Sequence, residues 1–389
     1  MDTTPPRWLL PAIVIAQLLA TSLWFAPNAV IGDLQDAWGT DGGEGIVTTA
    51  VQLGFIAGTL CFALLAIADR FHPGNVFLLS ALTGAAANAS VLLYPEQFGA
   101  VLAARFIVGF SLAGVYPVGM KMAAGWYGGG LGRALGFLVG ALVLGTASAH
   151  LISAVGVTWN WQAVILGTSV LAVVAGLLAW SVPEGPNLKR SGAVRFAGVF
   201  RAFRVPRFRA TVMGYFGHMW ELYALWAFIP VWFVAYGLER QALSMAAFAF
   251  IGVGALGCAA GGLLVERFGG GRVAITQLGT SALCCLLSPL MLAAPPWLFA
   301  VFVLVWGVTA AGDSPQFSAL NARHAPADIV GSALTLTNCI GFSISIGSLM
   351  LLEWLQFRVE PAYLLIALLP GPLLGLLAAR PLWTRQDGD

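Results

Sequence analysis

The stretch GHMWELYALW at 217–226 places a histidine and a glutamate three residues apart among apolar side chains. Residues at this spacing are neighbours on a helix, so His218 and Glu221 can meet. Burying a charge costs free energy unless the charge has a partner, so the pair needs water, a substrate or another polar group beside it. We interpret Glu221 as a proton carrier or substrate contact whose protonation His218 adjusts. The alternative is a fixed polar pair that ties this helix to a neighbour.

The chain around this pair has the composition of a membrane protein. Hydrophobic residues make up 59% of the 389 residues and charged residues only 9%, whereas soluble domains carry about 25% charged residues. Apolar runs long enough to cross a bilayer as helices recur along the sequence. We predict twelve spans, near 8–31, 45–68, 74–94, 98–120, 133–156, 161–182, 210–236, 242–265, 272–293, 297–320, 329–356 and 360–382.

Basic residues divide unevenly between the loops that these spans define. Nearly all of the 19 Lys and Arg fall on one side if the N-terminus is cytoplasmic, and the positive-inside rule then places both termini in the cytoplasm. We read the N-terminus as an uncleaved first span of a bacterial inner-membrane protein. All five cysteines fall inside predicted spans, so we expect neither disulfides nor a metal site.

An internal repeat divides the chain into two halves. GFSLAGVYP in the fourth span matches GVTAAGDSP in the tenth, which aligns Gly109 with Gly307 and Pro117 with Pro315 at an offset of 198. ADRF at 68–71 matches VERF at 265–268 at nearly the same offset. We therefore predict two parallel six-span halves, 1–182 and 210–389. The basic linker 183–209 joins them and is expected to contain a short helix on the membrane surface.

This architecture resembles the major facilitator superfamily over the whole chain. The strongest local match is the loop after the second span of each half, GLLVERFGGGR in the second copy and LAIADRFHPGN in the first. The first copy departs from the family pattern at Leu65, where the family has glycine. The acid of each copy can bind a neighbouring arginine or a helix N-terminus, in a contact that would form in one conformation and break in the other. A plain surface turn is the alternative. The gating candidates are Asp69, Arg70, Glu266, Arg267 and Arg272.

The resemblance implies an all-α membrane fold in which helices one, four, seven and ten line a central cavity. Polar residues at helical spacing lie on each of these spans. The expected substrate-binding or proton-binding residues are Gln17, Thr21, Trp24 and Asn28 in the first span, Arg105 and Tyr116 in the fourth, Tyr215, His218 and Glu221 in the seventh, Asp313 and Gln316 in the tenth, and Asn338 in the eleventh.

The depth or the alternative role of three of these residues can be stated more closely. Glu221 follows the inner-surface residue Arg209 by about 18 Å of helix, at about 1.5 Å per residue, which places it near the middle of a hydrocarbon core of about 30 Å. Arg105 is expected to bind a carboxylate of the substrate or of the protein, and a structural ion pair is the alternative. Asp313 is equally consistent with a functional acid and with a helix break, because Pro315 removes a backbone donor.

The leading functional hypothesis is a secondary transporter that moves a small polar solute, such as an organic anion, by alternating access coupled to protons. Sodium coupling stays open. The runner-up is proton-driven efflux of a hydrophobic compound, and more distant alternatives are a substrate-sensing receptor and a membrane-embedded metal enzyme that uses His218, Glu221 and Asp313. We expect a monomer in the lipid bilayer that is not an enzyme, with no cofactor, no metal and no nucleic-acid partner.

Overall fold

A computed structural model describes the chain except for residues 1–4, 128–130, 157–159, 189–198, 327–328 and 385–389. The described residues form α-helices and short 3₁₀ helices, and no β-strand occurs within these ranges. The chain divides into two compact units, Met1–Val194 and Arg195–Asp389, and each is described by itself.

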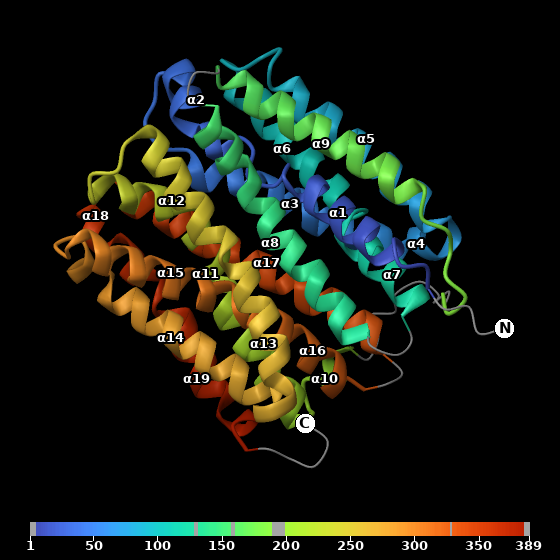
Figure 1. Cartoon of the computed structure of the whole chain (residues 1–389). Helices are drawn as coiled ribbons and strands as arrows, with labels where there is room; N and C mark the ends of the chain where they lie inside the picture. The colour runs from blue at the N-terminus through green and yellow to red at the C-terminus, as the bar shows by residue number, and fades with distance from the viewer. Residues whose placement is uncertain (1–4, 128–130, 157–159, 189–198, 327–328, 385–389) are drawn as a thin grey trace. The chain divides into compact units, whose positions relative to one another are not determined.

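Unit 1 contains the first series of helices (Figure 1). Its elements are α1 Leu9–Thr21, η1 Asn28–Val30, α2 Ile31–Trp38, α3 Glu44–Leu64, α4 Ile67–Arg70, α5 Pro73–Ser90, α6 Phe98–Leu112, α7 Tyr116–Trp126, α8 Leu131–Val155 and α9 Gln162–Trp180. Helix α3 packs on α6, α5 packs on α9, and α1 packs on both α8 and α9. A Cβ at Gly109 would lie 1.8 Å from the Val51 carbonyl oxygen, so only glycine allows α3 and α6 to approach this closely.

Unit 2 is built around one long helix. Its elements are α10 Val199–Ala202, α11 Pro206–Ala235, α12 Arg240–Gly252, α13 Gly254–Phe268, α14 Gly270–Met291, α15 Pro296–Gly312, α16 Ser314–His324, α17 Val330–Leu355, α18 Pro361–Leu364, η2 Leu365–Leu368, α19 Pro370–Ala379 and η3 Arg380–Leu382. Helix α11 packs against α16, α17 and α19. Gly217 lies directly against Gly371 and Gly375 of α19, where any larger side chain would collide with backbone.

The sequence repeat reappears as matched helices in the two units. One apolar helical segment runs over Phe98–Trp126 and another over Pro296–His324, with the same length of 29 residues and the offset of the repeat. Each segment is interrupted near its middle, between α6 and α7 and between α15 and α16. Gly307 also repeats the role of Gly109, because a Cβ there would lie 2.2 Å from the Phe250 carbonyl oxygen.

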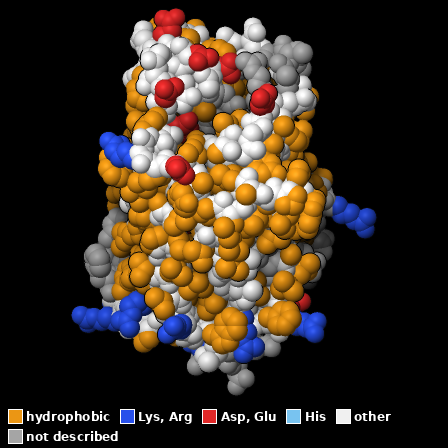
Figure 2. All heavy atoms as spheres, turned by 90° about the vertical axis from the view of Figure 1, so that its left-hand side faces the viewer, with side chains coloured by type: hydrophobic (Ala, Val, Ile, Leu, Met, Phe, Trp, Pro, Cys, Tyr) orange, Lys and Arg blue, Asp and Glu red, His pale blue; other side chains and the backbone are white. Residues whose placement is uncertain are grey.

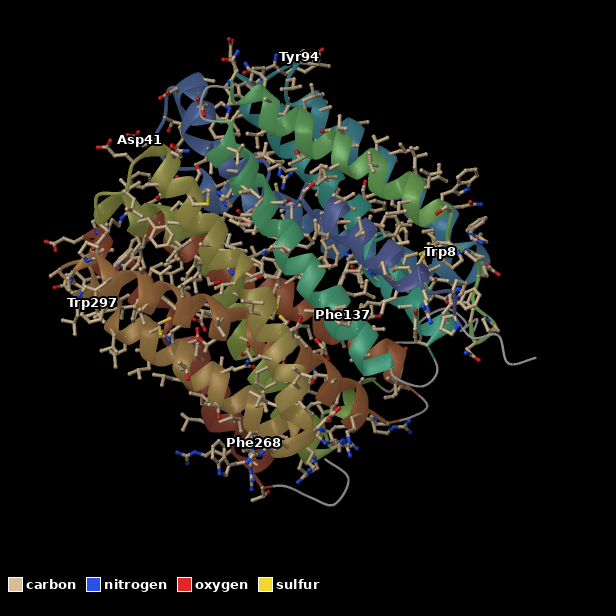
Figure 3. All side chains as sticks on the ribbon, viewed as in Figure 1. Trp8, Asp41, Tyr94, Phe137, Phe268 and Trp297 are labelled. Atoms are coloured by element: carbon tan, nitrogen blue, oxygen red, sulfur yellow. The ribbon has the colours of Figure 1, made fainter. Side chains whose placement is uncertain are left out.

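Many of these helices are suited to a lipid environment. Among the described residues, nine helical segments are long and apolar enough to cross a membrane. Hydrophobic side chains cover much of the face drawn in Figure 2, and Lys and Arg gather along its lower edge. In unit 2, Trp297 at the start of α15 and Phe268 at the end of α13 mark opposite ends of the helices (Figure 3).

The structure differs from expectation at the first span. We predicted one helix over 8–31, but α1 ends at Thr21, and residues 22–27 form turns before η1 and α2. Pro27 explains part of this break, because proline has no N–H to continue the helical ladder and disfavours helical geometry in the residue before it.

The expected surface helix of the linker lies partly outside the described residues, which exclude 189–198. The part that is described, α10, ends in Ala202, which packs against Phe208, Val212, Ala325 and Ala333 of unit 2.

Candidate functional site

Helix α11 carries His218 and Glu221 into the interior of unit 2. Their exposed fractions are 1% and 2%, so neither side chain faces solvent. A Cβ at Gly214, one turn before His218, would lie 2.4 Å from the Phe317 ring of α16. Gly214 therefore allows α16 to approach α11 closely, and this brings the junction of α15 and α16 beside His218.

Glu221 accepts hydrogen bonds from two neighbouring helices. The Ser281 hydroxyl of α14 donates to Glu221 Oε1. Trp306 Nε1 of α15 also donates to this oxygen, at 3.3 Å, and lies 3.1 Å from Ser281 Oγ. Cys285 Sγ is a further donor at 3.4 Å. All four residues are buried, so among the described residues the carboxyl group is held by neutral donors and not by a cation.

His218 contacts Asp313 instead of Glu221. Its Nδ1 lies 2.8 Å from Asp313 Oδ1, and both side chains are 1% exposed. Asp313 stands between the end of α15 and the start of α16. Pro315 lies in the first turn of α16, where its missing N–H costs little. His218 Nε2 has no hydrogen-bond partner among the described residues.

These contacts form a buried cluster of two carboxyl groups and one imidazole. A charge in an apolar interior is costly unless it is paired. The cluster places two carboxyl groups and one imidazole, all buried, within unit 2. Among the described residues, no group of three or more His, Cys, Asp and Glu is placed to hold a metal ion.

Two other predicted residues of unit 2, Tyr215 and Gln316, make contacts outside this cluster. The Tyr215 hydroxyl donates to Asn338 Oδ1 of α17 at 3.3 Å. With its amide turned to the orientation that satisfies both groups, Gln316 connects two helices: its nitrogen donates to the Gly312 carbonyl of α15 at 2.5 Å, and its oxygen accepts from the Gly262 N–H of α13 at 3.2 Å.

In unit 1, Arg105 is fully buried, and its contacts with described residues are to backbone carbonyls. Its guanidinium donates to the Leu23 carbonyl at 3.0 Å and to the Trp24 carbonyl. In a continuous helix the Leu23 carbonyl would accept from the N–H of position 27, but that residue is Pro27. Arg105 therefore supplies donors where the first span is broken.

The four polar residues of the first span do not share one face, because the helix ends among them. A Cβ at Gly119 in α7 would meet Gln17 Oε1 at 2.6 Å. Thr21 lies against α8 near Leu142, and Trp24 packs on the Phe55 ring of α3 at 5.1 Å between centroids. Asn28 donates to Thr48 Oγ1 at 2.9 Å. Tyr116 is half-buried at the start of α7.

The gating candidates lie at helix ends. Asp69 of α4 forms an ion pair with Lys121 of α7, whose Nζ also donates to the Ala68 carbonyl at 2.6 Å. His72 caps α5 by accepting the Gly74 N–H at 3.1 Å.

The second copy of the loop makes different contacts. Arg267 stacks over Phe268 at 5.2 Å from the ring centroid, and Arg272 Nε donates to the Trp383 carbonyl at 2.9 Å. Glu266 is exposed in the last turn of α13, as Arg70 is at the end of α4.

Sequence reasoning missed Ser281, Cys285, Trp306 and Lys121. One signal could have found part of this set: Ser281, Cys285 and Ser288 recur at spacings of four and three, which places three small polar groups on one face of α14. No comparable pattern pointed to Trp306 or Lys121.

Comparison with known proteins decides the family. The model of the Major Facilitator Superfamily matches residues 13–349. The chain belongs to this superfamily. The resemblance seen in the sequence is thereby confirmed, and with nine candidate spans among its described helices the chain is an integral, multi-pass membrane protein. The family points to a membrane transporter and not to an enzyme.

The chain is also similar to two individual proteins, one by sequence and one by structure. It is 28% identical, over 144 residues, to a protein of Bacillus subtilis (strain 168) assigned as a niacin/nicotinamide transporter, NiaP. That alignment covers 36% of this chain and 35% of NiaP. The crystal structure of a mutant of the nucleoside transporter NupG matches with a TM-score of 0.71 over 96% of this chain and 98% of NupG. With 16% identity, NupG shows a shared fold alone.

Proposed function

We propose that this protein is a secondary transporter that moves a small polar solute by alternating access, with Glu221 carrying the coupling proton. The observation that carries the proposal is the Glu221 carboxyl group, buried in the middle of α11 and held by the neutral donors Ser281, Trp306 and Cys285. When the described hydrogen-bond donors to a buried carboxyl group are all neutral, the group changes its charge by gaining or losing a proton. That property is what a proton-coupled transporter needs.

The proposed topology has twelve spans with both termini in the cytoplasm. Among the described residues, nine segments meet the criteria for a span by length and composition. Three further helices would complete the set: α1, which is short and apolar, and α5 and α11, which are long enough to cross a bilayer. The two halves, 1–182 and 210–389, would then alternate around the linker 183–209.

His218 and Asp313 form the second element of the proposed mechanism. Because His218 contacts Asp313 at 2.8 Å, the pair places ionisable groups one helical turn from Glu221. We propose that the pair sets the pH range of transport, whereas Glu221 transfers the proton. If Asp313 is the carrier instead, the two carboxyl groups exchange these roles.

The relative of higher identity supports the choice of substrate class. NiaP is assigned to niacin and nicotinamide, which are small polar molecules with an aromatic ring. We therefore propose a small polar solute of this size, and niacin and nicotinamide are the first compounds to test. A ligand that binds only the folded protein raises its apparent stability by mass action, so a thermal-shift screen of metabolites identifies the substrate before flux is measured.

The decisive experiment uses purified protein in proteoliposomes with an imposed pH gradient. Glu221→Gln keeps the size of the side chain but cannot exchange a proton, so gradient-driven accumulation should be lost while exchange of loaded substrate persists. Glu360→Gln, at an exposed glutamate before α18, is the matched control and should accumulate substrate normally.

Three results would change the proposal. Full accumulation by Glu221→Gln together with its loss in Asp313→Asn would move the proton to Asp313. Accumulation driven by a sodium gradient at equal pH on both sides would replace the proton as the coupling ion. Binding without any flux in the unmodified protein would indicate a receptor.

A further inference from the structure

A hollow of about 560 Å³ lies on the surface of unit 2 between α14 and the end of the chain. Its volume falls within the roughly 300–1,000 Å³ that is typical of small-molecule sites. The lining residues are Ile275, Leu373, Leu376, Leu377, Arg380 and Trp383. Helices α14 and α19, which supply most of them, lie side by side (Figure 1). None of these residues belongs to the cluster around Glu221.

One wall of the hollow is an apolar stripe of α19. Leu373, Leu376 and Leu377 recur at helical spacing. Arg380 lies about 10 Å beyond Leu373 along the helix axis, at about 1.5 Å per residue. Leu373 is 46% exposed and Leu377 is 54% exposed. In a membrane-spanning protein such an exposed leucine stripe faces acyl chains.

The end of the stripe is cationic. Arg380 lines the hollow, and Arg272 in the first turn of α14 donates from Nε to the Trp383 carbonyl at 2.9 Å. A guanidinium carries five N–H donors, so this one contact does not exhaust Arg272. The N-terminus of α14, a helix of 22 residues, adds partial positive charge at the same place.

Close packing holds these charged groups together. A Cβ at Gly271 would lie 2.2 Å from the Leu382 carbonyl oxygen, so glycine at this position allows the start of α14 to touch η3. Trp383, 51% exposed, follows directly, and tryptophan is enriched where the bilayer meets water. Tryptophan beside arginine at this end of the helices is the combination expected at the level of the lipid headgroups.

We propose that this hollow, the Arg380 groove, binds an anionic phospholipid. The phosphate would lie between Arg272 and Arg380 beside the N-terminus of α14, and one acyl chain would follow the leucine stripe of α19. Basic pockets between membrane helices bind anionic headgroups in this way. The apolar wall that continues from the charged end favours a lipid over a free phosphate ion.

Native mass spectrometry of the full chain in detergent with added phosphatidylglycerol tests the site. Arg380→Gln should weaken retention of the first lipid about fivefold, the effect expected for one basic side chain at an anionic headgroup. Leu377→Trp fills the groove without changing charge and should weaken retention as well. Its side chain already faces lipid, so folding should be preserved.

Arg358→Gln is the matched control. Arg358 also lies beside a tryptophan, with its guanidinium 4.4 Å from the Trp354 ring, but it does not line the hollow. This variant should retain phosphatidylglycerol like the unmodified protein, and phosphatidylcholine should bind weakly to all three variants.

Two outcomes would overturn the proposal. Equal loss of lipid in the Arg358 and Arg380 variants would mean general attraction between arginines and anionic lipid. Displacement of phosphatidylglycerol by millimolar inorganic phosphate, with no effect of Leu377→Trp, would mean an anion site that does not recognise an acyl chain.

Discussion

Replacing Arg105 by glutamine is expected to destabilise unit 1. The guanidinium is fully buried and donates to the carbonyls of Leu23 and Trp24, which glutamine is too short to reach together. A buried acceptor left without a partner costs about 1–3 kcal/mol, so two of them correspond to about 2–6 kcal/mol. Removing a charge from an apolar interior offsets part of this cost, and we therefore expect a loss of about 2–3 kcal/mol.

Thermal unfolding of the purified, ligand-free protein measures this loss. For a unit of about 200 residues, 1 kcal/mol moves the melting temperature by roughly 2–4 °C, so Arg105→Gln should lower it by about 4–12 °C. Arg70→Gln removes an exposed arginine from the same unit and should change it by less than about 2 °C.

A second substitution tests the cause. Pro27→Ala restores an N–H that can reach the Leu23 carbonyl. In this background the cost of Arg105→Gln should shrink by about the cost of one orphaned carbonyl, about 1–3 kcal/mol. If Arg105→Gln melts like the unmodified protein and loses only ligand binding, Arg105 binds substrate and the backbone contacts are incidental. If the two substitutions are simply additive, Pro27 is not the reason that Arg105 is needed.

Three further experiments probe packing and polar contacts. Gly109→Val should prevent stable folding, because its Cβ would lie 1.8 Å from a carbonyl oxygen, whereas Gly136→Val, with nothing within 4 Å, should express and elute normally on size exclusion. A double-mutant cycle on Asp69 and Lys121 should give a coupling of about 0.5–1 kcal/mol, since the pair is only partly buried; zero coupling would show that the contact contributes nothing. Asn88→Leu removes donation from α5 to Ile165, Thr168 and Ser169 of α9 and should cost about 1–2 kcal/mol in denaturant titration, and an unchanged midpoint would contradict this.

The helical, membrane-embedded character of the chain could be read from the sequence. Apolar runs of bilayer length and the scarcity of charge leave few other folds, and the matched GFSLAGVYP and GVTAAGDSP segments pointed to the repeat. These features are local in the sequence. Run length, composition and spacing can be read without knowing which helices touch.

The identities of the buried polar residues were also available, because a charge inside an apolar span stands out by itself. His218, Glu221, Asp313 and Arg105 were all recognised in this way. Their partners were not. Helical spacing suggested that His218 would meet Glu221, whereas His218 meets Asp313, and Arg105 meets backbone carbonyls instead of a carboxylate.

Those partners were decided by tertiary structure. Which side chains meet between two helices depends on how far each helix is rotated about its axis and how closely the backbones approach. Gly214 and Gly217 set that approach for α11 by letting Phe317 and Gly371 into contact. The packed helices bring residues about 60 to 95 positions away beside Glu221 and His218. A periodicity of three to four residues carries no information about contacts at that separation, so the donors around Glu221 became visible only when the helices were packed together.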